Sequence, residues 1–492
     1  MIKQACIGLY SIGLKAYWNQ FDGLKERLGF YGDFIKDRLE ATSEVHYFGM
    51  VDDEQTALAA GEWFNERNVD LIFVHSATYC TSSCVLPVHQ ICKAPVVILN
   101  LQPTTAMNYI KTGTGEWLAN CGACPVPEIV NVLERANIKA ATVNGLLGMD
   151  KSWKDSAADE NTANRDEAKR AWREIENYVT AAGVKRGLIG ARFGFLGNYY
   201  SGMLDMYSDF TMLQKDFGLH IEVLEMCALN SIFESITDDE INAKSDEIKN
   251  FFKVGEQSPA DPLAGMPSNE QMKFSAKVAA ATEKLVQEYG LDALSYYYHG
   301  QRGNMYEQLA AGLIAGNSLL TAKGVPCAGE GDIKTNVAMK ICDLAGRGGS
   351  FTEIVAADYN LGTIILGHDG PFHINIAAEK PVLRGMKLYH GKRGAGISVE
   401  AQVKTGDVTM LGLTQVSGGR HKMIISEGET INSQTLMIGN TQTHVKFSKG
   451  IDEYFSQWFK EAPTHHLAMS IGKNADLFVK VAEMLGIEWV KI

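Results

Sequence analysis

The feature that most constrains the fold is the alternation of short β-rich runs with helical stretches in the first third of the chain. Residues 22–40 and 53–68 carry apolar side chains at three- and four-residue spacing, which predicts helices. Strand-like runs flank them, and these cover residues 5–10, 44–50, 71–75, 95–101 and 140–144. Strands that alternate with helices of this length indicate βαβ units and a parallel sheet. Such sheets bind ligands at the carboxyl ends of their strands, which here lead into loops at 11–20, 76–83 and 102–112.

The alternation resumes after a charged, Ala-rich stretch at 150–179, which predicts an exposed loop and then a long helix between domains. The second alternating set covers residues 187–193, 200–217, 220–225, 238–252, 272–289, 293–298 and 305–323. Beyond Phe351 the runs become short and are separated by glycines or polar turns, which is typical of antiparallel strands. These runs cover residues 362–366, 397–403, 408–415, 422–426, 436–438 and 444–447, and a helix is expected at 474–485.

We therefore predict an α/β protein of three domains. Two Rossmann/flavodoxin-like parallel-sheet domains, residues 1–180 and 181–350, precede a β-rich, antiparallel and barrel-like C-terminal domain with a terminal helix, residues 351–492. The length of 492 residues agrees with this division, because single cores rarely grow that large.

Charge and cysteine content narrow the function. The formal charge of −12, without a dense Lys/Arg stripe, argues against a nucleic-acid partner. No apolar run approaches the roughly 20 residues that span a bilayer, and no signal-like segment opens the sequence. Nine cysteines, an odd number, are typical of reduced thiols. We expect a cytoplasmic protein with neither a nucleic-acid nor a membrane partner.

The segment Gly-Glu-Gly-Asp at 329–332 comes directly before a helix-like run at 333–344. Its glycines let the backbone bend tightly and leave room beside the acidic side chains. By itself the segment is more typical of a loop in which Asp332 caps the helix and Glu330 is solvated. Glu353, His368 and the pair His465-His466 are also unremarkable one at a time.

Taken together, these carboxylates and imidazoles form a mixed oxygen and nitrogen donor set. Such a set suits Mn²⁺, Mg²⁺ or Co²⁺ rather than a thiolate-bound structural zinc. Two glutamates at one metal would also supply the acid/base pair that enediol chemistry needs. The residues alone do not establish that the four groups meet in space.

The segments at 329–335, 348–353 and 366–368 and the late His-His pair resemble the L-arabinose isomerase family, within the L-arabinose/L-fucose isomerase group. The resemblance is specific over residues 325–370 and at His465-His466, and weaker elsewhere. It implies two α/β domains with a β-rich domain, an aldose–ketose isomerase working through an enediol, a sugar substrate, Mn²⁺ or another divalent ion, and a trimeric or hexameric homo-oligomer. It implies metal ligands at Glu330, Glu353, His368 and His466, with Glu330 and Glu353 as catalytic acid and base.

The sequence differs from the family in the segments that determine substrate specificity. The family's Gly-Ser-Gln-His-Leu-Tyr-Gly-like loop after the first strand is replaced by residues 10–20. Candidate substrate-binding residues are Gln102, His465, Tyr17, Trp18, Tyr79 and Arg302. If two of the cations Lys15, Arg192 and Arg302 face the pocket, the substrate is anionic, such as sulfoquinovose or a sugar phosphate. Otherwise a neutral sugar such as L-arabinose remains open.

The sequence argues against two other functions. Cys121 and Cys124, with Cys80, Cys84, His89 and Cys92 nearby, suggest zinc or redox chemistry, but no second CxxC follows and residues 84–92 are typical of a helix packed on the sheet. The first strand lacks GxGxxG, which argues against dinucleotide binding. The rival that stays open is a non-catalytic sugar-binding or regulatory protein on the same fold.

Overall fold

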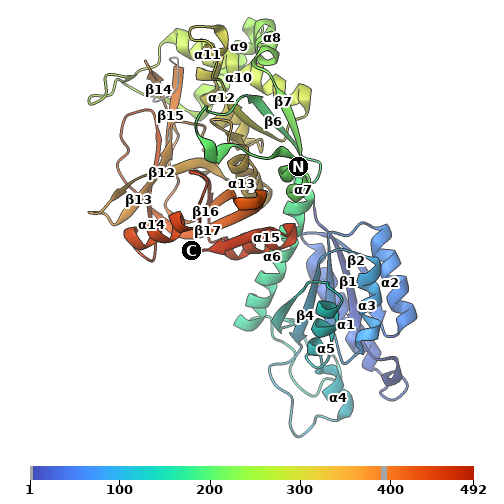
Figure 1. The fold of residues 1–492 in the computed structure, drawn as a ribbon. Coiled ribbons are helices and arrows are strands. Elements are labelled where there is room, and N and C mark those ends of the chain that lie inside the picture. The colour runs from blue at the N-terminus through green and yellow to red at the C-terminus, as the bar shows by residue number, and fades with distance from the viewer. Residues whose placement is uncertain (1–3, 389–395) are drawn as a thin grey trace. The chain divides into compact units, whose positions relative to one another are not determined.

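The computed structural model describes residues 4–388 and 396–492, so the first three residues of the sequence lie outside the description. The chain divides into two compact units, Met1–Arg186 and Gly187–Ile492 (Figure 1). The expected long helix is present as α6 (Asp166–Leu188), which carries the chain from one unit into the other. The finer boundary expected at residue 350 stays a prediction.

The first unit contains a five-stranded parallel sheet of order β2-β1-β3-β4-β5. This is the flavodoxin-like order of doubly wound sheets. Its strands are β1 (Cys6–Ile12), β2 (Glu44–Val51), β3 (Leu71–Ser76), β4 (Val96–Gln102) and β5 (Ala140–Leu146), and its other helices are α1 (Leu24–Glu40), α2 (Glu54–Glu66), α3 (Leu86–Ile91), α4 (Thr114–Ala119) and α5 (Val126–Arg135). β1 and β3 are buried throughout, as strands covered on both faces should be. All five predicted strands are confirmed.

The second unit begins with a four-stranded parallel sheet of order β11-β10-β6-β7. The strands are β6 (Arg192–Gly197), β7 (His220–Leu224), β10 (Ala293–Tyr297) and β11 (Cys327–Ala328). The helices of this region are α7 (Phe210–Phe217), α8 (Met226–Ser235), α9 (Asp238–Phe251), α10 (Asn269–Tyr289), α11 (Met305–Ala311), α12 (Leu313–Ala322) and α13 (Ile333–Leu344). The predicted parallel α/β character of this region is confirmed, although its first strand begins at Arg192, not at residue 187.

The C-terminal part is dominated by a seven-stranded mixed sheet of order β16-β19-β12-β13-β18-β17-β20. Its strands are β12 (Ser350–Asp358), β13 (Thr363–His368), β16 (Gly406–Gln415), β17 (His421–Ile431), β18 (Thr441–Lys446), β19 (His466–Ile471) and β20 (Glu488–Lys491), accompanied by α14 (Ile451–Lys460) and α15 (Ala475–Leu485). β16 also pairs with β17, so each of the six antiparallel strands has two antiparallel neighbours, and β17 pairs in parallel with β20 as well. The barrel-like form stays a prediction.

A small sheet of order β15-β14-β8 accompanies it, formed by β8 (Lys253–Val254), β14 (Val382–Met386) and β15 (Gly396–Glu400), and β9 (Ala264–Gly265) pairs with β14. The strand predicted at 436–438 is wrong. Leu436 is 61% exposed, and its N–H and carbonyl bond to the side chain of Gln442 instead of to a neighbouring strand. Across the described ranges, no helix is both long enough and apolar enough to cross a membrane.

Candidate metal centre

Three of the four predicted metal ligands come from adjacent strands of the C-terminal sheet. β12 lies between β13 and β19, and its Glu353 is opposite Gly367 of β13 and His466 of β19. His368 follows Gly367 at the end of β13. The strand register thus brings together Glu353, His368 and His466, whose potential ligand atoms lie within 4.8 Å of one another.

The fourth, Glu330, lies in the loop between β11 and α13. It forms one group of this kind with His465 and His466, and another with His368 and Asp369. The two glutamates fall in different groups, which overlap through the two imidazoles of His368 and His466. The structure therefore gathers all four predicted ligands at one place in the second unit.

The backbone at Glu330 is held in an unusual conformation. Its φ of 61° lies in the left-handed region, which residues other than glycine rarely adopt. The next residue, Gly331, also has positive φ, and a Cβ there would lie 2.7 Å from the carbonyl oxygen of Asn198. The N–H of Tyr200 donates to the Glu330 carbonyl at 3.0 Å. Because Glu330 is only 6% exposed, the solvated-loop interpretation of this residue is wrong.

Asp332 links the loop to the histidines. It caps α13 as expected, since its Oδ1 accepts from the Thr335 N–H at 3.0 Å and its Oδ2 from the Thr335 hydroxyl at 2.8 Å. The same Oδ2 lies 3.0 Å from Nδ1 of His466. Burial opposes ionisation, but the His466 hydrogen bond and the charge of Lys334 lower the pKa of Asp332 to about 2. An ionised Asp332 can only accept, so His466 carries its proton on Nδ1.

This tautomer leaves a lone pair on Nε2 of His466. Nε2 lies 3.2 Å from Nε2 of His368 and 3.5 Å from Oε2 of Glu330. Burial, against the pull of Asp332, lowers the pKa of His466, so the ring is neutral. The ring of Phe351 packs against both imidazoles, with centroid distances of 4.7 Å to His368 and 4.4 Å to His466. Electron-rich atoms that converge around one point in this way fit a bound cation.

The donor set also fits a divalent ion. Two carboxylates and two imidazoles are oxygen and nitrogen donors, with no thiol among them. Metal-binding histidines are usually oriented by a carboxylate on the other ring nitrogen. Asp332 does this for His466, and Asp369 Oδ1 lies 3.2 Å from Nδ1 of His368.

His465 also lies beside the carboxylate of Glu330. Its Nε2 lies 3.9 Å from Oε2 of Glu330, and Asp205 Oδ2 accepts from both its backbone N–H, at 3.0 Å, and its Nδ1, at 2.6 Å. Burial opposes it, but the hydrogen bonds to Asp205 and Glu330 raise the pKa of His465 to about 10. Lys334 holds the Asp205 segment, because its Nζ donates to the carbonyls of Asp205 and Met206. His465 is thus a positioned, positively charged donor beside Glu330.

Four of the other predicted substrate-binding residues belong to the first unit. These are Tyr17, Trp18, Tyr79 and Gln102. Tyr17 and Trp18 follow the carboxyl end of β1, Tyr79 follows that of β3, and Gln102 is the last residue of β4. Gln102 Nε2 donates to Asn120 at 2.8 Å and Trp18 Nε1 to Asp52 at 2.7 Å. Their substrate role stays a prediction.

The three cations considered for an anionic substrate are placed differently from one another. Lys15 pairs with Asp53 at 2.6 Å, and Arg192 pairs with Glu222 at 2.5 Å. Arg192 begins β6, at the amino end of its parallel sheet, whereas Glu330 follows the carboxyl end of β11. Arg302 lies in an exposed segment between β10 and α11. Two of the three positive charges are therefore already matched by carboxylates.

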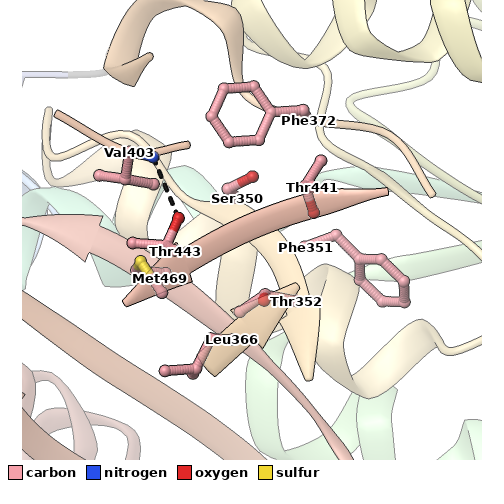
Figure 2. Close-up of a pocket in the computed structure, with 9 residues that line it drawn as sticks. All are labelled: Ser350, Phe351, Thr352, Leu366, Phe372, Val403, Thr441, Thr443 and Met469. Carbon is pink, nitrogen blue, oxygen red and sulfur yellow. Dashed lines mark hydrogen bonds between the residues drawn. The ribbon is translucent and has the colours of Figure 1, made fainter. Parts of the chain in front are cut away.

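A small cavity of about 10 Å³ lies beside Phe351 among the strands of the C-terminal sheet (Figure 2). It is lined by Ser350, Phe351, Thr352, Leu366, Phe372, Val403, Thr441, Thr443 and Met469. Three of its hydroxyls already accept backbone hydrogen bonds: Ser350 from His373, Thr441 from His368 and Thr443 from Val403. With so small a volume and its hydroxyls engaged in this way, the cavity is a poor site for a sugar.

Sequence reasoning missed several contributors to the centre. Asp332 was recognised only as a helix cap, and Asp369 and Phe351 were not singled out although each adjoins a predicted ligand or its motif. Asp205 has no local signal, because 260 residues separate it from His465.

Comparison with known proteins agrees with the geometry. A family model described as the L-arabinose isomerase C-terminal domain matches residues 348–488, which include Glu353, His368 and His466. An L-arabinose isomerase from Cellvibrio japonicus (strain Ueda107) is 26% identical over 290 residues, covering 57% of this chain and 55% of that protein. Those from Shewanella sp. (strain MR-4) and Bacillus subtilis (strain 168) are each 24% identical, covering 65% and 56% of this chain and 63% and 55% of their own lengths.

The matches thus span 55% to 63% of the lengths of these relatives. A solved structure of a Nostoc punctiforme debranching enzyme aligns at 12% identity over 74% of this chain and 88% of that one, with a TM-score of 0.12, which is too low to indicate a shared fold. Residues 348–488 thus match the C-terminal domain of the L-arabinose isomerase family, and 56% to 65% of the chain is similar to these L-arabinose isomerases.

Proposed function

We propose that this protein is a divalent-metal-dependent aldose–ketose isomerase acting on a sugar. The observation that carries the proposal is the convergence of Glu330, Glu353, His368 and His466 from segments distant in sequence. A binding protein would not need two carboxylates at such a centre. An isomerase needs them, because a proton must leave one carbon and return to its neighbour.

Each residue has a part in this proposal. Glu330, Glu353, His368 and His466 hold the ion, with Mn²⁺ as the native metal and Mg²⁺ or Co²⁺ as alternatives. When bound, the ion supplies Lewis-acid polarisation of the sugar's carbonyl and hydroxyl oxygens. One of the two glutamates removes the proton from the carbon next to the carbonyl, and the proton returns to the adjacent carbon of the enediol. The charged His465, 3.9 Å from Glu330, orients a sugar hydroxyl.

We further propose a neutral sugar as the substrate. An anionic sugar would require at least two cations in the pocket, but Lys15 and Arg192 are each paired with a carboxylate. Asp205, Asp332 and Glu330 around His465 add negative charge to the centre. Both features disfavour a sulfonate or phosphate on the substrate, and L-arabinose, on which the relatives are named to act, is the first candidate.

The test measures deuterium incorporation into the sugar and ketose formation in the same incubation. Neutral pentoses, deoxyhexoses, sugar phosphates and sulfonated hexoses are incubated in D₂O with Mn²⁺ and either the wild type or Glu330→Gln. We expect ketose from a neutral aldose with the wild type and none with the variant, whose circular dichroism stays unchanged. A non-catalytic sugar-binding protein gives neither ketose nor deuterium at C2 with any sugar. Full turnover in Glu330→Gln would overturn the roles given to this residue.

The remaining features of the proposal concern assembly and location. We propose a cytoplasmic homo-oligomer, a trimer or hexamer, with the sugar as its small-molecule partner. All nine cysteines are free thiols, which agrees with a reducing compartment. Sedimentation of the purified protein tests the oligomeric state, and a monomer at micromolar concentration would contradict it.

A further inference from the structure

A second cluster of metal-binding groups lies in the first unit, at the amino ends of β1 and β2. Cys6 begins β1 and Glu44 begins β2, and the parallel register pairs them directly. His46, two residues after Glu44, is paired with Gly8, so both β2 side chains lie on the face that Cys6 presents. The Cys6 thiol, a Glu44 carboxylate oxygen and a His46 ring nitrogen all lie within 4.8 Å of one another.

The surroundings of this cluster are rich in acceptors. The thiol of Cys6 donates to the carbonyl of Arg67, the residue that follows the last turn of α2, at 3.7 Å. Carbonyls at this end of a helix form the negative pole of its dipole. The Cys6 N–H donates to Asp70 Oδ2 at 2.7 Å, and Glu44 Oε1 lies 3.1 Å from His46 Nε2. Burial, then the charges of Glu44 and Asp70, raise the pKa of Cys6 to about 11, while Arg186 opposes this. The same negative field attracts a cation.

We propose that Cys6, Glu44 and His46 form a zinc site separate from the isomerase centre. A thiolate, an imidazole and a carboxylate are the ligand types that Zn²⁺ prefers, and three protein ligands leave its fourth position open. Atoms that share a zinc ion at bonds of about 2.0–2.3 Å lie within about 4.6 Å of one another, so the observed spacing needs only a small side-chain adjustment.

The three ligands differ in how readily they can adjust. Cys6 is 3% exposed and fixed in the sheet, whereas Glu44 is exposed and His46 half-buried, so the two outer ligands can close on the sulfur. The imidazole of His46 already packs edge-on against Trp63 of α2 at 5.8 Å, which limits its rotation. Binding releases the thiol proton, so the affinity for zinc rises with pH.

Cobalt distinguishes this site from the isomerase centre, because only a thiolate ligand gives Co²⁺ an intense near-ultraviolet charge-transfer band. The full-length chain is saturated with Mn²⁺ and then titrated with Co²⁺. We expect a band that Zn²⁺ abolishes, that is lost completely in Cys6→Ser, and that requires at least about ten-fold more Co²⁺ in His46→Gln. The partly exposed His46 allows this second variant to fold even if Cys6→Ser does not.

The matched control is Cys121→Ser/Cys124→Ser, which removes two thiols that lie close together elsewhere in the first unit and is expected to leave the band intact. Absence of the band in the wild type, its persistence in Cys6→Ser, or its loss in the Cys121/Cys124 variant would each overturn the proposal. None of the three ligands belongs to the isomerase centre. Failure here therefore leaves the proposed isomerase function standing.

Discussion

Nδ1 of His466 lies 3.0 Å from Oδ2 of Asp332, and both side chains are fully buried. This contact determines which nitrogen of His466 carries the proton, and therefore which nitrogen faces His368 and Glu330. It also connects the start of α13 to the start of β19 across 134 residues. The centre depends on this contact as much as on the ligands themselves.

Replacing Asp332 with Asn tests the contact while keeping the helix cap. Asn retains an oxygen that accepts from the Thr335 N–H, so the cost to α13 is small. It loses the charge that fixes the His466 tautomer, and we expect metal affinity to fall by about 10–100-fold. Metal titration of the variant measures this, with Asp476→Asn, on the exposed first turn of α15, as the matched control. Wild-type metal affinity in Asp332→Asn would show that Asp332 does not orient His466 for metal binding.

The strained loop at Glu330 gives a second prediction. Gly331→Ala puts a side chain at a φ of 77° and 2.7 Å from the Asn198 carbonyl oxygen. We expect a loss of about 1–3 kcal/mol in the free energy of unfolding and a fall in turnover, because Glu330 must shift. Gly290→Ala is the control, since it has a φ of 59° but no neighbour within 4 Å. Similar losses of turnover in both variants would show that displacement of Glu330 is not the cause.

Acid stability of the first unit follows from two buried histidines. Burial lowers the pKa of His75 to about 3, and burial with the charge of Lys93 lowers that of His89 to about 3. In the unfolded chain both titrate near about 6.5, so between these values the unfolded state binds more protons. The free energy of unfolding should therefore fall as pH drops through this window.

Urea unfolding at several pH values, from above the unfolded histidine pKa of about 6.5 down to about 4, measures how the free energy of unfolding changes with pH. His89→Gln keeps a partner for the Tyr10 hydroxyl, which lies 3.0 Å from His89 Nε2, and removes one titrating group. We expect a shallower pH dependence in this variant. An unchanged slope would mean that His89 does not titrate on unfolding.

Much of the fold was predictable because burial follows simple periodicities. The central strands β1, β3 and β4 are largely apolar and buried, since helices cover a parallel sheet on both faces. β12 and β19 were not predicted, and each carries a ligand: polar residues such as Glu353 and His466 interrupt the apolar pattern because the centre needs them there. At such positions the requirements of the site, and not the local apolar pattern of a strand, determine the residue type.

The candidate centre was predictable in its ligands but not in its support. Glu330, Glu353, His368 and His466 stand in local motifs, whereas the role of Asp205 arises only when the chain folds its segment beside His465. Lys334 gave no signal either, because a lysine that is fully buried with three hydrogen bonds cannot be told from a surface lysine by its neighbours in sequence.

Metal dependence tests the central claim most directly. Metal is removed from the wild type, His466→Gln and Glu330→Gln with a chelator, and Mn²⁺ is then added back in steps. At each step, electron paramagnetic resonance measures the bound Mn²⁺ and an assay measures ketose formation. We predict that the stripped wild type is inactive, and that turnover returns in proportion to the Mn²⁺ bound. Both variants should bind the ion far more weakly. Undiminished turnover without metal, or unchanged Mn²⁺ binding in both variants, would contradict the assignment of this centre.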